Sequence, residues 1–177
     1  GNCLLDEWVR KKSKKKFDKN GELARSGKVN ELILNQALDN FSIRKFNKSL
    51  DVNDFDISFI KGLSLEDGCA TLTKFSAFLI AEGIKRTAKF NSSSLEVSLM
   101  CGGGRKNDFL IESINENLDR NKDILMNIDN YGFDGDFVEA QAFGYLSIRT
   151  FLDLPISFPK TTGCKVPTVG GIIVENF

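Results

Sequence analysis

Three consecutive glycines divide the middle of the sequence into two segments of different periodicity. Before them, the apolar run over residues 95–101 indicates a strand. After them, Asn107 opens a segment whose apolar residues share one face of a helix, at Leu110, Ile111, Ile114 and Leu118. Strand, glycine turn and capped helix in this order constrain the chain to an α/β fold.

The glycines themselves, Gly102, Gly103 and Gly104, form the first candidate binding site. Such a turn brings bare backbone close to a phosphate or a sugar ring, because a side chain would block the approach. A tight connection without a ligand is the alternative, but one glycine would suffice for it. A dinucleotide site is less favoured, because Asn107 stands where the G-x-G-x-x-G pattern needs its third glycine.

The composition excludes several kinds of site. The chain has 177 residues and no histidine, so we expect neither a zinc site nor histidine-dependent nucleophilic catalysis, and no metal ligands in this chain. Acidic and basic residues number 24 each, so no overall field attracts nucleic acid or a membrane. No apolar run is long enough to cross a bilayer. The scattered thiols favour a reducing cytoplasm; they are Cys3, Cys69, Cys101 and Cys164.

A basic run over residues 10–16 invites a nucleic-acid or nuclear-import interpretation, since six of its seven residues are Lys or Arg. The alternative is a solvated helix end, where cations complement the helix dipole. The absence of net charge and of a flanking aromatic pattern favours the helix end. We therefore expect no nucleic-acid partner and no membrane partner.

The pattern along the chain predicts one α/β domain with few strands for its helices. The predicted helices cover residues 4–9, 22–38 with a break near Gly27, 64–89, 107–118 and 136–152, and the predicted strands cover 95–101, 123–128 and 169–174. Ser64 and Asp67 are spaced as a capping box for the longest helix. Prolines are expected to keep the segment over residues 155–167 extended. Such a small sheet under long helices looks incomplete, which makes self-association as a homodimer plausible.

The second candidate site is the segment over residues 131–139. Asp136 is predicted to cap the following helix, with Glu139 as the reciprocal half of the capping box or as an acceptor for ligand hydroxyls. A calcium loop fails, because Tyr131 and Val138 would occupy ligand positions. A glycosidase pair is also disfavoured, since Asp136 and Glu139 lie too close in sequence to flank a sugar from opposite faces.

A pattern spread over nearly the whole chain joins these segments. Its residues are Gly1-Asn2-Cys3-Leu4-Leu5-Asp6-Glu7-Trp8, Phe17-Asp18, Gly21-Glu22-Leu23-Ala24, Ser26-Gly27-Lys28-Val29, Asp67, Ala70-Thr71-Leu72-Thr73, Ala77, Cys101-Gly102-Gly103-Gly104-Arg105, Asn107, Glu139-Ala140, Ala142-Phe143, Leu154-Pro155, Pro159, Thr162-Gly163 and Gly170. Together they resemble the C-terminal half of the anhydro-N-acetylmuramic acid kinases, cell-wall recycling enzymes of the actin-like ATPase superfamily.

The resemblance implies ATP-dependent opening of the 1,6-anhydro bond of 1,6-anhydro-N-acetylmuramic acid, which yields N-acetylmuramic acid 6-phosphate and ADP. In such kinases two RNase H-like lobes close on ATP, Mg²⁺ and sugar. Carried over, Gly102, Gly103 and Gly104 would lie against the nucleotide, with Asn107 fixing the turn. Glu139 would contact the sugar.

The resemblance also implies that parts of the kinase lie outside residues 1–177. The phosphate-binding loop and most of the Mg²⁺ site belong to an N-terminal lobe. The aspartate expected to act as base would stand four positions before Gly1, so no catalytic residue is assigned within this chain. We therefore expect a single C-terminal lobe that is inactive alone. A stand-alone nucleotide-binding module without catalysis is the alternative.

Overall fold

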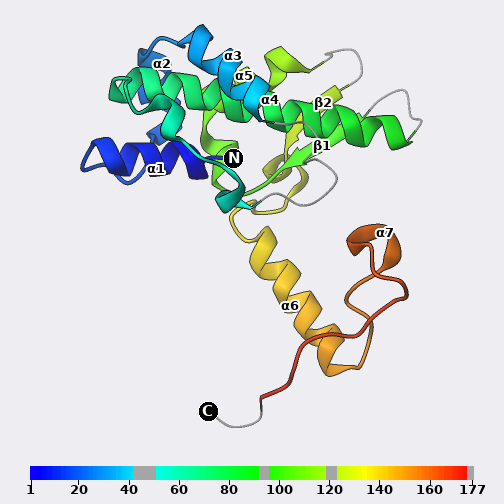
Figure 1. The fold of residues 1–177 in the computed structure, drawn as a ribbon. Coiled ribbons are helices and arrows are strands. Elements are labelled where there is room, and N and C mark those ends of the chain that lie inside the picture. The colour runs from blue at the N-terminus through cyan, green and yellow to red at the C-terminus, as the bar shows by residue number, and fades with distance from the viewer. Residues whose placement is uncertain (42–50, 92–95, 119–122, 175–177) are drawn as a thin grey trace.

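The computed structural model describes residues 1–41, 51–91, 96–118 and 123–174 (Figure 1). Its architecture is α/β, helix-rich with a small sheet, as the sequence predicted. The helices are α1 (Cys3–Lys12), α2 (Glu22–Ser26), α3 (Glu31–Asn40), α4 (Leu65–Asn91), α5 (Asp108–Asn117), α6 (Val138–Phe151) and α7 (Pro159–Thr162). The strands are β1 (Glu96–Met100) and β2 (Asp123–Asn127). No helix of the described residues is both long and apolar enough to cross a membrane.

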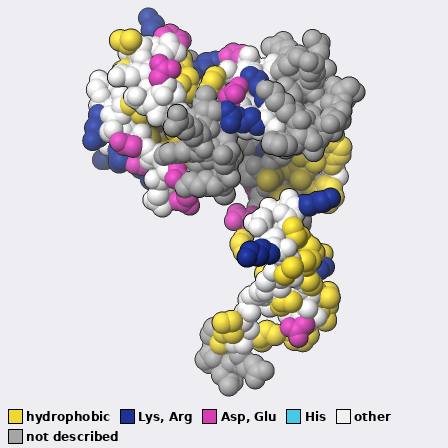
Figure 2. All heavy atoms as spheres, turned by 45° about the vertical axis from the view of Figure 1, so that its right-hand side comes forward, with side chains coloured by type: hydrophobic (Ala, Val, Ile, Leu, Met, Phe, Trp, Pro, Cys, Tyr) yellow, Lys and Arg dark blue, Asp and Glu magenta, His cyan; other side chains and the backbone are white. Residues whose placement is uncertain are grey.

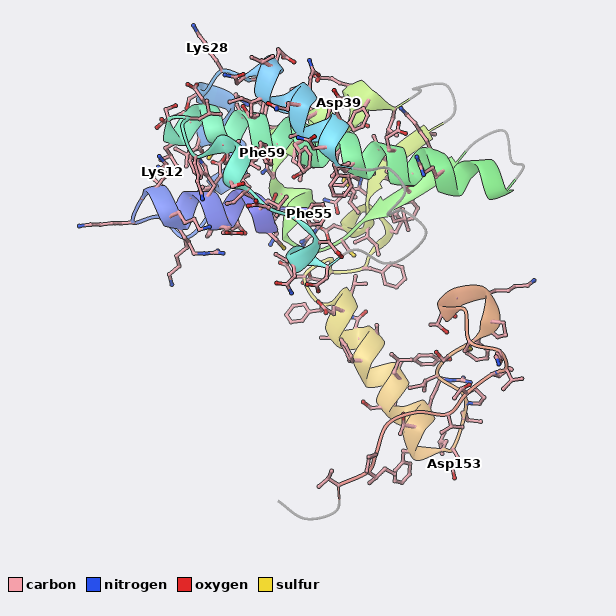
Figure 3. All side chains as sticks on the ribbon, viewed as in Figure 1. Lys12, Lys28, Asp39, Phe55, Phe59 and Asp153 are labelled. Atoms are coloured by element: carbon pink, nitrogen blue, oxygen red, sulfur yellow. The ribbon has the colours of Figure 1, made fainter. Side chains whose placement is uncertain are left out.

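The long helix α4 is the centre of the body, and α1, α2, α3 and α5 pack around it (Figure 1). Trp8 of α1 is buried against α4, and its Nε1–H donates to the carbonyl of Leu65 at 3.1 Å. Aromatic rings pack farther along α4, where Phe59 lies 5.3 Å from Phe75 between ring centroids (Figure 3). Burial of this apolar surface is the main force holding the helices together.

Local polar contacts set the helix ends. Ser64 caps α4 by accepting from the Asp67 N–H at 3.0 Å, as predicted. The Asp67 carboxylate instead accepts from the Lys28 N–H at 2.7 Å and so fixes the chain between α2 and α3. Gly27 ends α2 there, which confirms the predicted break, and Asn30 caps α3 by accepting from Ile33 N–H.

The sheet contains β1 and β2, paired in parallel from Glu96↔Asp123 to Met100↔Asn127, with α5 as the crossover. Leu125 packs on the cluster formed by α4 and α5, so one face of the sheet is covered. Val97 and Leu99 point to the other face and are about half exposed (48% and 49%). Among the described residues this face lacks a covering layer.

The chain after β2 leaves the body. Helix α6 projects from it and carries no buried residue, and apolar side chains gather along this arm (Figure 2). The predicted strand over residues 169–174 is wrong. Just before this segment the described residues form a single antiparallel bridge, Ser157↔Thr168, and no described strand lies beside residues 169–174 to continue the pairing. The segment over 155–167 is not wholly extended, because Pro159 begins the short helix α7.

Candidate functional site

The glycine turn joins β1 to α5 and presents bare backbone. Gly102 has a φ of +73°, in the left-handed region, so the turn requires glycine there. Gly103 and Gly104 have no such requirement, and a Cβ at Gly103 would meet no described atom within 4 Å. A Cβ at Gly104 would meet only Leu110, at 3.8 Å. The fold of the described residues therefore leaves two of the three glycines unexplained.

The backbone N–H groups of the turn divide into used and unused donors. The Gly102 N–H donates to the carbonyl of Gly135 at 2.8 Å. The N–H groups of Gly103 and Gly104 have no acceptor among the described residues. Unused amides beside open space are suited to a phosphate or another polar group.

Asn107 anchors the far end of the turn. Its side-chain oxygen accepts from the Leu110 N–H at 3.0 Å and caps α5, as the sequence predicted. Its amide also donates to the Asn2 side chain at 3.3 Å, which ties the turn to the start of α1. With 1% of its surface exposed, Asn107 shapes the turn from behind.

Arg105 links the glycine turn to the second candidate site. Its side chain is 3% exposed; its Nε donates to Asp129 at 2.9 Å, and its Nη1 donates to Asp136 at 2.5 Å. The same Nη1 donates to the Gly102 carbonyl at 3.0 Å. The carboxylates of Asp136 and then Asp129 accept these bonds and raise the pKa of the guanidinium, so Arg105 is always charged.

The sequence predicts Asp136 as the cap of the helix that follows it, and the structure contradicts this role. Helix α6 begins after Phe137 and has no side-chain cap. Asp136 instead pairs with Arg105 and with Lys106, because two cations are nearby. Hydrogen bonds from Arg105 and then Lys106 lower the pKa of Asp136 to about 2.

Glu139 lies in the first turn of α6, four residues after Gly135. Its side chain is exposed, and no hydrogen bond or ion pair holds it among the described residues. The predicted role as half of a capping box is wrong, because α6 lacks a side-chain cap. The carboxylate is therefore available to a ligand, and the bond between Gly102 and Gly135 ties the base of α6 to the glycine turn.

The acidic residues near the turn do not suit Mg²⁺. No group of three or more His, Cys, Asp or Glu side chains among the described residues is arranged to hold a metal ion. Asp129 and Asp136 form salt bridges with Arg105, and Asp134 lies 3.6 Å from the same guanidinium. The described carboxylates beside the turn are therefore already engaged by a cation of the protein itself.

The basic run has the features of a helix end. Arg10, Lys11 and Lys12 form the last turn of α1, where cations complement the helix dipole. Lys11 pairs with Glu7 at 2.5 Å, and the Lys12 ammonium lies 4.8 Å from the centroid of the Trp8 ring. These local contacts explain the first three basic residues of the run, whereas Lys14, Lys15 and Lys16 follow the end of α1 and are exposed.

Comparison with known proteins decides the family. A family model described as anhydro-N-acetylmuramic acid kinase matches residues 1–176. The chain belongs to the anhydro-N-acetylmuramic acid kinase family. This confirms the resemblance found in the sequence.

Curated relatives of the same name extend the match. The anhydro-N-acetylmuramic acid kinase of Pelagibacter ubique is 49% identical over an alignment of 179 residues that covers 100% of this chain and 48% of that protein. The Rhodospirillum rubrum kinase is 37% identical over 172 residues (97% of this chain, 44% of that protein). The Brucella canis kinase is 36% identical over 176 residues (99% and 46%). The chain thus spans about half the length of these anhydro-N-acetylmuramic acid kinases.

Sequence patterns did not identify Arg105 as the residue that joins the two candidate sites. The sequence did contain a signal: an arginine directly after a glycine turn, and aspartates at 129, 134 and 136. Local patterns could not pair them, because 24 and 31 residues separate the bonded partners.

Proposed function

We propose that this chain is the C-terminal lobe of an ATP-dependent sugar kinase with an RNase H-like, actin-like ATPase fold. Its reaction would convert 1,6-anhydro-N-acetylmuramic acid to N-acetylmuramic acid 6-phosphate in cell-wall recycling. Membership of the family supports the reaction. The exposed face of the two-stranded sheet supports a larger sheet in the complete protein.

The observation that carries the proposal is the open glycine turn. Gly103 and Gly104 have neither a left-handed φ nor a close neighbour that would explain glycine. A ligand that approaches the backbone directly does explain them, and the free N–H groups suit the polar part of ATP. Glu139, exposed and unpaired among the described residues, would accept hydrogen bonds from the sugar hydroxyls.

This chain would supply positioning more than chemistry. Phosphoryl transfer depends mainly on alignment and on stabilising charge as it develops. The turn would place the nucleotide and Glu139 would orient the sugar. The base, the phosphate loop and the Mg²⁺ ligands would come from residues outside this chain. The use of ATP as substrate and the four free thiols favour a cytoplasmic location. The exposed apolar arm would be available for contacts in a homodimer.

The complete product of the reading frame that encodes residues 1–177, called here the complete gene product, provides the test. We expect ADP release that requires 1,6-anhydro-N-acetylmuramic acid, with a product carrying phosphate at O6 by mass spectrometry. Gly103→Val should lower this activity by at least about 10²-fold, since a misplaced substrate costs that much. Residues 1–177 alone should give no turnover.

Absence of sugar-dependent ADP release from the folded complete gene product would contradict the kinase assignment. Full activity in Gly103→Val would leave the kinase assignment standing but would contradict the role of the glycine turn. Turnover by residues 1–177 alone would contradict the division of roles between the two halves. A nucleotide-binding module without catalysis would instead bind ATP and release no ADP.

A further inference from the structure

One buried side chain, that of Arg105, connects the glycine turn to the base of α6. Arg105 lies in the turn that follows β1, and its partners lie in the loop between β2 and α6. Its guanidinium binds Asp129, where that loop begins, and Asp136, two residues before α6. It therefore spans the whole loop.

Backbone contacts complete the junction. Asp129 uses its second oxygen to accept from the Gly135 N–H at 2.8 Å, and the Gly135 carbonyl accepts from the Gly102 N–H at 2.8 Å. The loop backbone also lies close against the guanidinium, since a Cβ at Gly135 would stand 2.5 Å from Arg105 Nε. Neither loop can shift without breaking bonds to a buried charge, which is costly.

Among the described residues α6 buries no side chain, so the loop that precedes it sets the direction in which it leaves the body. Glu139 stands in the first turn of this helix. A displacement of the glycine turn would therefore be passed to Glu139 through Arg105.

We propose that Arg105 is a positioning residue that couples the glycine turn to Glu139, so that a nucleotide on the turn and a sugar at Glu139 bind cooperatively. This inference rests on the proposed function, because it takes the turn as the nucleotide site and Glu139 as the sugar contact. Arg105 itself touches neither ligand. Its fork of donors holds two carboxylates and a carbonyl at once, which a lysine cannot reproduce.

The test measures the coupling between the two ligands in the complete gene product. The Kd of 1,6-anhydro-N-acetylmuramic acid is determined by calorimetry with and without a non-hydrolysable ATP analogue. We expect the analogue to tighten sugar binding by a factor in the range of about 5–150. In Arg105→Lys this factor should fall towards one, with the loss of sugar affinity confined to the ternary complex.

Two further variants separate positioning from folding. Gly135→Ala adds a methyl group against the guanidinium, keeps every charge, and should also reduce the coupling factor. Arg25→Lys is the matched control, because Arg25 pairs with Glu112 at 2.8 Å on the exposed surface of the body. This control should keep the wild-type factor. Thermal unfolding of all variants shows whether the fold persists.

The possible outcomes distinguish a failure of the proposed function from a failure of the role of Arg105. No binding of the ATP analogue by the wild type would contradict the proposed function itself. Binding of both ligands with a coupling factor of one in the wild type would overturn the role of Arg105 alone. A wild-type factor in folded Arg105→Lys and Gly135→Ala would overturn it as well, as would a loss of coupling in Arg25→Lys.

Discussion

Glycines in this chain meet different physical requirements, and the structure separates them. A Cβ at Gly27 would overlap the backbone carbonyl of Glu66, and one at Gly68 would overlap the Trp8 ring, so both positions serve packing. Gly102 serves the turn through its φ of +73°. Gly103 faces open space. Gly103 and Gly104 meet neither requirement, and they stand side by side in the turn that follows β1, which favours a ligand there.

This distinction predicts opposite effects of two substitutions in the complete gene product. Gly27→Ala should destabilise the fold by about 1–3 kcal/mol, because overpacking against backbone forces the helices apart. Gly103→Val should change stability by no more than about 0.5 kcal/mol, like other surface substitutions, while weakening ATP binding. Urea unfolding measures the first quantity and an ATP titration the second. Equal destabilisation by both variants would make Gly103 a packing residue.

Single residues also show what local sequence patterns can predict. Ser64 and Asn107 were identified as caps because a cap acts within three residues along the chain. Asp136 was identified as a cap by the same rule, and that was wrong, because a cation from a distant turn competes for its carboxylate. Local rules therefore succeed where no charged partner arrives through the tertiary fold.

Helix α5 depends on its cap more than the other short helices do. Asn107 is almost fully buried, whereas Asn30, which caps α3 in the same way, is partly exposed. Loss of a buried cap leaves the Leu110 N–H without an acceptor or water.

Asn107→Ala should therefore destabilise the complete gene product by about 1–3 kcal/mol, from the lost cap and the unsatisfied donor. Asn30→Ala, the matched variant, should cost about 1 kcal/mol, because water replaces the side chain. Asn107→Ser restores an acceptor and should recover part of the loss. Denaturant unfolding measures all three, and an equal cost for the two alanine variants would contradict the burial argument.

At the level of elements, periodicity predicted the helices and both strands of the sheet, because amphipathic spacing reports a buried face directly. The strand predicted over 169–174 failed, since β-propensity in a short run says nothing about whether a neighbouring strand exists. The short helix α7 has a different reason: proline is read as favouring extended backbone, but Pro159 stands at the start of α7, where a missing N–H costs no helical hydrogen bond.

The whole molecule has two parts with different packing. The body around α4 has two clusters of buried apolar residues, whereas α6 and the segment after it expose large apolar side chains such as Phe151 (72%) and Ile172 (90%). The curated relatives are about twice as long as this chain. Under the proposed function, the other half of such a kinase would cover the arm and the open face of the sheet.

The nucleotide site is the central claim, and hydrogen–deuterium exchange tests it most directly. In the complete gene product, the amides of Gly103 and Gly104 have no acceptor among the described residues and should exchange rapidly. Saturating ATP with Mg²⁺ should slow exchange in the peptide that covers residues 102–107, while the exposed basic run near Lys14 stays unchanged. Unchanged exchange at residues 102–107 with ATP bound would place the nucleotide elsewhere and contradict the account.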